Sequence, residues 1–326
     1  MASSFAKDSG IPTFAARPVK ADRPGADAPP FKATAASVVA ERLRRQVHVM
    51  LVQEEQFRSD LPDAEHRMRV AVRRLRSALR TFGPLVGPGP APDLQGELRW
   101  LAGTLGAVRD RLVLGERLRE ELDRLPPEQV VGPVRSRVDH HLAAEVASAR
   151  TEALAVLDCH RYGLLVDQIT SFSERPPFRS AAGGPARQVL AQLVADELRR
   201  LRRHVRAAFA APIGAQRDLA FHRVRKTAKR VRYGAETLRP ICKSEAKAFV
   251  AELTTVQDIL GDHQDAVMAG VLLRDLAIAA SAAPGENGYT FGLLSGLELL
   301  KARADEEAFA DAWAQFDHKS TWRWLK

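Results

Sequence analysis

The chain has 326 residues, 45% of them hydrophobic, and 49 lysines and arginines stand against 40 aspartates and glutamates. That length allows one large or two ordinary domains, and the net charge of +9 favours an anionic partner. The two cysteines, Cys159 and Cys242, fit neither a disulfide framework nor a zinc motif, which indicates a reducing compartment. No apolar run is long enough to span a bilayer, and no secretion signal is visible. We therefore expect a cytoplasmic protein without membrane contact.

Residues 1–32 differ in composition from the rest of the chain. They carry five prolines among scattered Ala, Gly and Asp and have no periodic apolar face, which predicts a disordered tail or linker. From Ala33 onward, apolar residues recur every three or four positions, and the breaks fall at proline or glycine. No alternating β-branched runs occur, so the sequence predicts an all-α domain over residues 33–326.

The helical region contains an internal repeat. Residues 66–84 align with residues 222–240 at an offset of 156, and Asp110 aligns with Asp265 at an offset of 155. The matches keep their order over about 70 residues, which argues against chance. The repeat predicts two halves of similar build, about 33–180 and 185–326. Each half has the length of a four-helix bundle.

The repeated segment in the first half, "HRMRVAVRRLRSALRTF" at 66–82, holds six arginines and no acid. On an α-helix, its apolar residues fall on one stripe and its cations on a second stripe about 120° away. The apolar stripe predicts the face that packs into the core. We call the other stripe the first cationic stripe; its members are His66, Arg69, Arg73, Arg76 and Arg80.

The second half repeats this arrangement in "FHRVRKTAKRVRY" at 221–233. We call the set His222, Arg225, Lys229 and Arg232 the second cationic stripe. The helix that precedes each stripe adds a pair of basic residues four positions apart, on one face. The full predicted binding site is Arg44, His48, His66, Arg69, Arg73, Arg74, Arg76, Arg80, Arg200, Arg203, His204, His222, Arg225, Lys226, Lys229 and Arg232.

Two cationic stripes without compensating acids need a physical explanation. Like charges at i and i+4 destabilise a helix by a few tenths of a kcal/mol per pair. A solvated surface helix normally balances such charges with acids four residues away, but none occurs between Glu65 and Asp93. A bound polyanion would offset the repulsion in both halves. We therefore expect the two stripes to face each other across one cavity.

The histidines raise the question of a metal site. His66 and His222 begin their stripes, where neighbouring cations favour contact with an anion over coordination of a metal. The segment "GDHQD" at 261–265 places acids beside His263, which could suggest a metal ligand set. We interpret it instead as the start of a helix capped by Asp262. No metal site is predicted.

Four segments of the sequence resemble the CHAD family, the conserved histidine α-helical domain. They are "HRMRVAVRRLRSALRTF", "LGAVRDRLVL" at 105–114, "FHRVRKTAKRVRY" and "VQDILGDHQDA" at 256–266. The resemblance implies two four-helix bundles related by a pseudo-two-fold axis. It also implies a basic groove or pore between them that binds inorganic polyphosphate without catalysis. Leu112 departs from the family, which often has an acid at this position, and Lys229 stands where the first half has Arg73.

Three functional classes are compatible with such a domain. The first is polyphosphate binding through many Arg–phosphate contacts, which would also attach the protein to polyphosphate granules. The second is binding of nucleic acid or another phosphate-rich polyanion, but an aromatic content of 6% offers few residues for base stacking. The third is a phosphoanhydride-processing enzyme or its accessory module, for which no metal-binding carboxylate cluster is visible. We expect the first, with no catalytic residues and no cofactor.

Overall fold

The computed structural model describes residues 33–87, 89 and 91–326. The tail predicted at 1–32 lies outside these residues. Within them the regular structure is entirely helical, apart from two isolated β-bridges, Thr34 with Pro185 and Val86 with Phe178. The prediction of an all-α fold is confirmed. None of the helices in the described ranges combines the length and the apolar character needed to traverse a bilayer.

The first half of the fold is a bundle of four helices whose last member is broken. Its helices are α1 (Ala35–Arg58), α2 (Ala64–Thr81), α3 (Ala91–Arg124), α4 (Val134–Asp158) and α5 (His160–Glu174). Cys159 separates α4 from α5 because its backbone is extended, with φ −79° and ψ 150°. Helix α1 packs against both α2 and α5, which closes the bundle.

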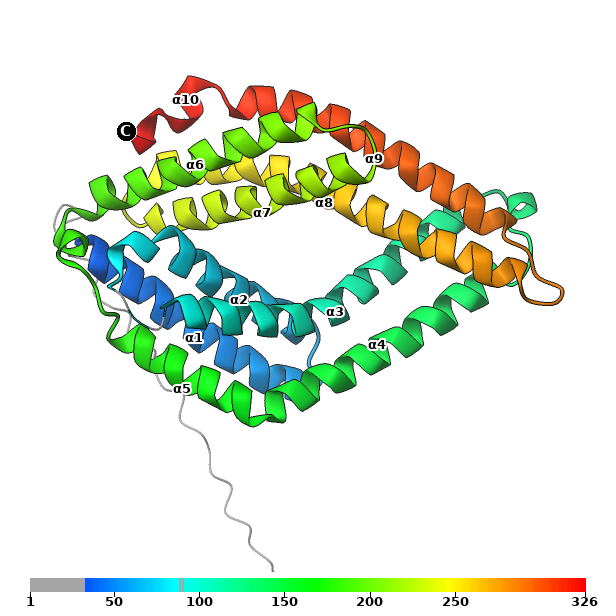
Figure 1. Ribbon diagram of the computed structural model, residues 1–326, viewed down its shortest axis with the longest axis horizontal. Helices are drawn as coiled ribbons and strands as arrows, with labels where there is room; N and C mark the ends of the chain where they lie inside the picture. Colours follow the sequence, from blue (N-terminus) through cyan, green and yellow to red (C-terminus); the bar gives the residue numbers. More distant parts are fainter. Residues whose placement is uncertain (1–32, 88, 90) are drawn as a thin grey trace, which may run out of the picture. The chain divides into compact units, whose positions relative to one another are not determined.

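The second half repeats this order with an unbroken fourth helix (Figure 1). Its helices are α6 (Ala186–Ala210), α7 (Ala215–Leu238), α8 (Lys243–Ser281) and α9 (Tyr289–Phe316), followed by the short α10 (Lys319–Trp322). Short 3-10 turns connect or end the helices; they are Gly83–Leu85, Pro127–Gln129, Ser180–Gly183 and Arg323–Leu325. The predicted pair of four-helix bundles is confirmed.

The apolar stripes of α2 and α7 form part of one core that runs through both halves. Met68, Val72 and Leu75 of α2 are fully buried, as are Val224 and Val231 of α7. Burying side chains of this size stabilises the fold by about 1.5–3 kcal/mol each. The sequence periodicity therefore predicted the buried face of both helices correctly. The position of this face also decides where the cationic stripe next to it points.

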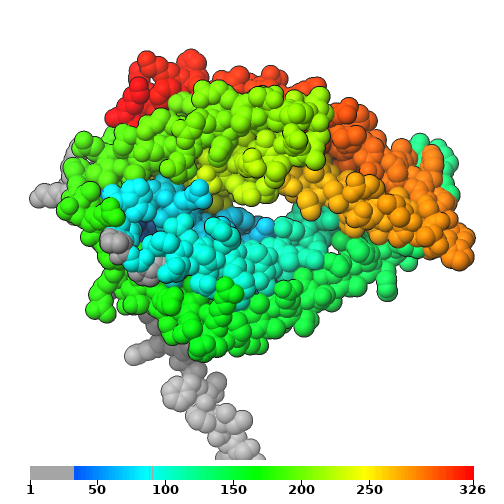
Figure 2. All heavy atoms as spheres, in the orientation of Figure 1, coloured from blue at the N-terminus to red at the C-terminus, as the bar shows by residue number. Residues whose placement is uncertain are grey.

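A second core joins the halves at their far end. Helices α3 and α8 are the longest of the described chain, with 34 and 39 residues, and they extend beyond the helices that precede them. Leu118 of α3 and Val138 of α4 pack there in one cluster with Leu273 of α8 and Phe291 of α9. The halves thus touch at both ends. Figure 2 shows an opening between these two contacts, bordered by α2 and α3 on one side and by α7 and α8 on the other.

One local prediction was wrong. Residues 261–265 do not begin a helix, and Asp262 caps nothing, because the segment lies in the middle of α8 (Lys243–Ser281). A glycine inside a helix costs only about 1 kcal/mol relative to alanine, which the packing of a long helix offsets. Gly261 was therefore mistaken for a helix boundary.

Candidate functional site

The two cationic stripes face each other between the halves. Helix α2 packs against α7, and the Nε of Arg73 on α2 donates a hydrogen bond of 3.1 Å to the hydroxyl of Tyr233 on α7. Lys229 of the second stripe lies close enough to Arg73 and Arg69 of the first for their charges to affect its pKa. Arg73 and Lys229 therefore lie near each other between the halves and not on opposite outer surfaces, whereas a cavity shared by the two stripes stays a prediction.

Lys229 lies at the centre of this positive region. Burial lowers its pKa to about 6, and the charges of Arg225, Arg73, Arg69 and Arg232 lower it in the same direction. An ammonium group is disfavoured there because it loses water and gains no acidic partner among the residues that the structure describes. At neutral pH, Lys229 is therefore mostly uncharged in the free protein, and a bound anion would favour its charged form.

Two acids that correspond in the repeat hold one arginine of each stripe. Asp110 pairs with Arg69 at 3.0 Å, whereas Asp265 lies near enough to Arg225 for its charge to oppose the lowering of the Arg225 pKa. Burial raises the pKa of Asp265, although the charges of Arg225 and Arg117 oppose this shift. Each of these acids compensates one cation, so the remaining charges of the stripes stay unbalanced.

Two glycines leave room for the same two arginines. A Cβ atom at Gly106 would lie 3.5 Å from Nε of Arg69, and one at Gly261 would lie 3.7 Å from Nη2 of Arg225. Both distances are ordinary contacts, so a longer side chain at either glycine would displace the guanidinium. These glycines therefore help to position the stripes.

The sequence analysis did not identify Tyr233 and Glu236, two residues of α7 that contact arginines of the site. Tyr233 is buried, and the guanidinium carbons of Arg74 and Arg232 lie 5.6 and 5.0 Å from the centre of its ring. Burial raises the pKa of Tyr233, but the charges of Arg73, Arg232 and Arg74 and the hydrogen bond from Arg73 together lower it further, so the net shift is downward. Glu236 pairs with Arg74 at 3.4 Å and with Arg42 of α1 at 3.1 Å. Arg74 is thus partly neutralised within the protein.

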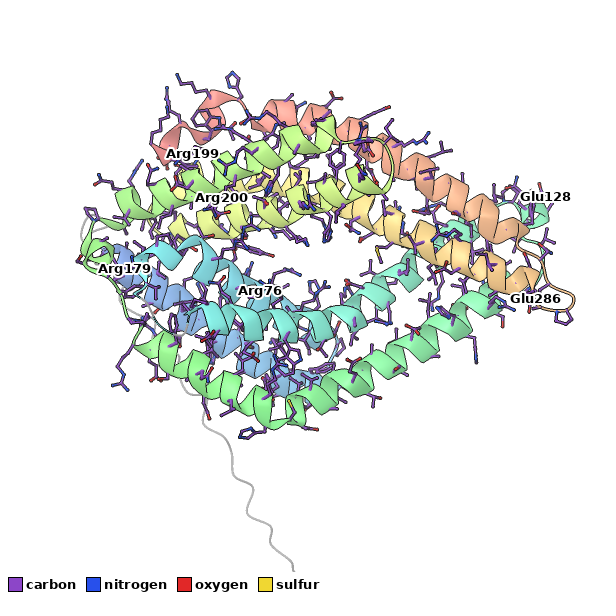
Figure 3. All side chains as sticks on the ribbon, viewed as in Figure 1. Arg76, Glu128, Arg179, Arg199, Arg200 and Glu286 are labelled. Carbon is purple, nitrogen blue, oxygen red and sulfur yellow. The ribbon has the colours of Figure 1, made fainter. Side chains whose placement is uncertain are left out.

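The part of the site around Arg76 is also cationic. Burial lowers the pKa of Arg76, and so do the charges of Arg99, Arg80 and Arg230. Figure 3 places Arg76 on the side of α2 that faces α7. Burial likewise lowers the pKa of Lys226, with Arg76 as the next cause. Arg99 and Arg230 were not predicted, because neither has the sequence spacing of the cationic stripes. They approach the site only through the packing of the helices.

His66 and His222 occupy matching places in the two halves. Among the described residues, neither Nδ1 atom has a hydrogen-bond partner, and both atoms are buried. Burial lowers the pKa of each histidine first, and then neighbouring cations add to the shift, Arg109 for His66 and Lys226 for His222. Both rings are therefore neutral in the free protein at pH 7. Buried polar atoms without partners cost free energy unless a ligand satisfies them.

The predicted residues of α1 and α6 are less closely tied to the stripes. Arg44 is exposed and pairs with Glu41 of its own helix at 2.9 Å, and His48 is exposed as well. On α6, Arg203 is exposed and Arg200 bonds Glu197 at 2.7 Å, whereas Nδ1 of His204 lies 2.8 Å from the hydroxyl of Thr227 on α7. Their place in a binding site stays a prediction.

The sequence of this chain is similar to those of known proteins. The family model of the CHAD domain matches residues 41–274. The chain belongs to the CHAD family. Two proteins of Mycobacterium tuberculosis are similar to it, Uncharacterized protein MT2285 of strain CDC 1551 / Oshkosh and Uncharacterized protein Rv2226 of strain ATCC 25618 / H37Rv. Each is 35% identical over 286 residues, which are 86% of this chain and 53% of the relative. This CHAD chain thus spans about half the length of these curated relatives.

Two solved structures share the CHAD fold of this chain. PptA from Streptomyces chartreusis aligns with a TM-score of 0.74 and 24% sequence identity, over 86% of this chain and 99% of the other. The CHAD domain from the plant Ricinus communis aligns with a TM-score of 0.65 and 25% identity, over 88% and 94% of the two chains. The alignments support the arrangement of the helices in both halves of the domain.

Proposed function

We propose that this CHAD domain binds inorganic polyphosphate between its two cationic stripes and performs no chemistry on it. The observation that carries this proposal is the meeting of Arg69 and Arg73 of α2 with Arg225 and Lys229 of α7. In the free protein the three arginines repel one another and disfavour the charged form of Lys229. A linear polyanion would offset that repulsion along the whole length of the stripes.

Arginine is suited to this role because its planar guanidinium donates paired hydrogen bonds to phosphate oxygens. Among the described residues, the Nε atoms of Arg225 and Arg232 are buried without a hydrogen-bond partner. Successive members of a stripe rise about 5 Å along the helix, so several phosphates of one chain can be contacted at once. Many modest contacts on one polymer then add up to a high affinity. Such binding would also attach the protein to polyphosphate granules.

Apart from its positive charge, the site lacks an accessible aromatic surface for nucleic-acid bases among the described residues. Tyr233, the aromatic residue between the stripes, is only 3% exposed and is flanked by arginines, so its ring cannot stack on a base. Flexible phosphate chains have no bases and need no such surface. This difference favours polyphosphate over the alternative of single-stranded DNA or RNA.

A competition experiment tests the proposal. Labelled long-chain polyphosphate is bound to the full chain, and unlabelled polyphosphate or single-stranded DNA is added at equal total phosphate. We expect polyphosphate to displace the label at a concentration at least tenfold lower than DNA. Equal displacement by both polymers would show that the site responds to charge alone and would contradict the proposed specificity. Release of orthophosphate from the bound polymer would contradict the proposal that binding involves no turnover.

A further inference from the structure

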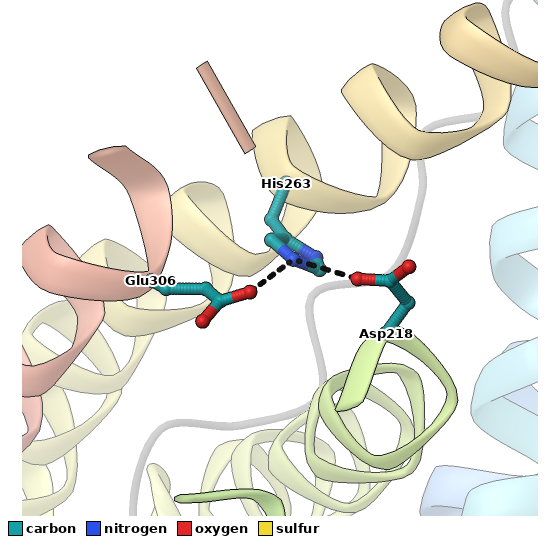
Figure 4. A group of neighbouring side chains, drawn as sticks. All are labelled: Asp218, His263 and Glu306. Carbon is teal, nitrogen blue, oxygen red and sulfur yellow. Dashed lines mark ion pairs between the residues drawn. The ribbon is translucent and has the colours of Figure 1, made fainter. Parts of the chain in front are cut away.

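Three residues that sequence analysis did not connect meet inside the second half (Figure 4). Asp218 of α7, His263 of α8 and Glu306 of α9 each offer one ligand atom, and these atoms lie within 4.8 Å of one another. The Nε2 of His263 is 3.7 Å from Oδ1 of Asp218 and 3.7 Å from Oε1 of Glu306. Each residue comes from a different helix, so the cluster is formed by the fold and not by a local sequence motif.

His263 points into this cluster without a hydrogen bond. Its side chain is 3% exposed, and no described residue offers Nε2 a hydrogen-bond partner. A separation of 3.7 Å exceeds the distance of a hydrogen bond, which is about 2.7–3.2 Å. A buried polar atom that is left in this state needs another partner.

The internal repeat shows that packing alone does not require a histidine here. His263 corresponds to Val108 of α3 at the offset of 155 residues, and Val108 is a buried member of the main core. Asp218 corresponds to Pro62 at the offset of 156. Val108 thus fills the place of His263 with an apolar side chain, whereas Pro62 is exposed just before the start of α2. The polar cluster is a feature of the second half alone and calls for a function of its own.

We infer that Asp218, His263 and Glu306 bind a divalent first-row metal ion of the zinc class. One imidazole nitrogen and two carboxylate oxygens form a ligand set that suits such an ion. Ligand atoms around a tetrahedral zinc lie about 3.3 Å apart. The two separations of 3.7 Å from Nε2 of His263 would therefore contract by about 0.4 Å, and the two carboxylate oxygens, which lie within 4.8 Å of each other, would approach by up to about 1.5 Å. A water molecule would complete the coordination.

Glu306 directs Oε1 toward His263, while its Oε2 pairs with Arg217 at 3.3 Å. The Nε2 of His263 faces an oxygen of each carboxylate, so an ion between them would be contacted by all three side chains. The side chains of Asp218 and Glu306 are 30% and 17% exposed, which gives an ion access from solvent. The ring of Phe221 lies 5.2 Å from that of His263 between their centres and helps to fix its orientation.

A bound ion would link three helices next to the binding site. Asp218 precedes His222, the first residue of the second cationic stripe, by one helical turn on α7. Coordination would therefore hold the beginning of α7 against α8 and α9. This role is structural and does not depend on which polyanion the stripes bind.

Metal titration of the full chain tests this inference. The protein is freed of metal with a chelator, shown to be free of phosphate, and titrated with Zn²⁺ alone by calorimetry. We expect one equivalent of Zn²⁺ to bind to the wild type and this equivalent to be lost in His263→Val, which restores the residue of the first half. Glu306→Gln should lose it too, which keeps the test valid if His263→Val folds poorly. His140→Val removes an exposed histidine outside the cluster and should keep the full equivalent.

A second measurement separates this site from general affinity of histidines for metal. Zn²⁺ should raise the melting temperature of the wild type and of His140→Val, but not that of Glu306→Gln. Absence of a stoichiometric site in the wild type would overturn the inference. Retention of the site in both His263→Val and Glu306→Gln would overturn it equally, because the metal would then be bound elsewhere.

Discussion

Arg73 and Tyr233 are joined by a hydrogen bond of 3.1 Å that connects the two halves of the protein through the middle of the site. The tyrosine belongs to the same helix as Arg225 and Lys229, so the bond fixes the distance between the stripes. It also holds the guanidinium of Arg73 in place before any ligand arrives. A preformed site of this kind loses less conformational freedom when it binds.

Removal of the Tyr233 hydroxyl should weaken the contact between the halves. We expect Tyr233→Phe to lower the free energy of unfolding by about 0.5–1.5 kcal/mol, the usual contribution of one hydrogen bond. Urea unfolding followed by circular dichroism measures this change. Tyr289→Phe alters a tyrosine that is 57% exposed and should have almost no effect. Equal losses of stability in the two variants would show that the bond to Arg73 contributes nothing.

Lys229 should make the stability of the free protein depend on pH. Its pKa is lowered to about 6 in the fold, with burial as the main cause, so the unfolded chain binds more protons between pH 6 and about 10. Stability must therefore rise with pH across this window, and the charged form present below pH 6 is the least favourable. Lys229→Met should remove this contribution. Unfolding free energies of both proteins at pH 6, 7, 8 and 9 give the difference in slope, and parallel curves would refute the prediction.

His66 and His222 should make binding of polyphosphate tighter at lower pH. Burial and nearby cations lower the pKa of both, Arg109, Arg73 and Arg69 for His66 and Lys226, Arg225 and Lys229 for His222. Phosphate oxygens favour the charged ring, so binding takes up protons and strengthens as pH falls from about 8 to 6. Affinities at constant ionic strength should show a flatter pH dependence in the double variant His66→Gln/His222→Gln. An unchanged slope would mean that these rings do not meet the polymer.

Lys229 contributes to the same uptake of protons. The Lys229→Met protein should therefore keep the part of the slope that arises from the histidines and lose the rest. Combining this change with the two histidine changes should leave the arginines as the remaining charges, whose binding varies little over this pH range. Calorimetry in buffers of different ionisation enthalpy counts the protons directly.

Gly261 offers a test of how the arginines are positioned. Alanine fits there, since its Cβ would lie 3.7 Å from Arg225, and it should stabilise α8 by up to about 1 kcal/mol. Leucine at the same position should displace Arg225 and weaken polyphosphate binding severalfold. Urea unfolding and binding assays of Gly261→Ala and Gly261→Leu compare the two changes. Binding that is equally strong in both variants would show that Arg225 does not need this space.

The repeat and the helical period were enough to predict the fold class and the faces of α2 and α7. Val72 and Val224 are buried, as predicted, because apolar spacing determines which side of a helix meets the core. The partners of the stripes were beyond such reasoning. Tyr233 reaches the site because of the way in which the halves dock, and Arg99 reaches it because α3 packs against α2. Both depend on contacts between segments that are apart in the sequence. Asp110 and Asp265 carried a visible signal, since they correspond in the repeat, but nothing in the sequence tied them to Arg69 and Arg225.

The metal-site cluster illustrates the same limit. The sequence drew attention to the acids beside His263, but side chains at adjacent positions of a helix point in different directions. The acids that meet His263 in the fold, Asp218 and Glu306, lie more than 40 residues away from it in the sequence. Only the packing of three helices brings them together.

Charge reversal within the stripes tests the central claim most directly. The affinity for long-chain polyphosphate is measured across a salt series for the wild type, for Arg73→Glu/Arg225→Glu, and for Arg303→Glu/Arg323→Glu, which changes net charge equally at exposed positions. Circular dichroism confirms that each variant keeps its helices. The account predicts that the first variant loses at least a hundredfold in affinity and much of its salt dependence, whereas the second loses less than about tenfold. Equal losses in the two variants would contradict it, because net charge and not the facing stripes would then be what binds the polymer.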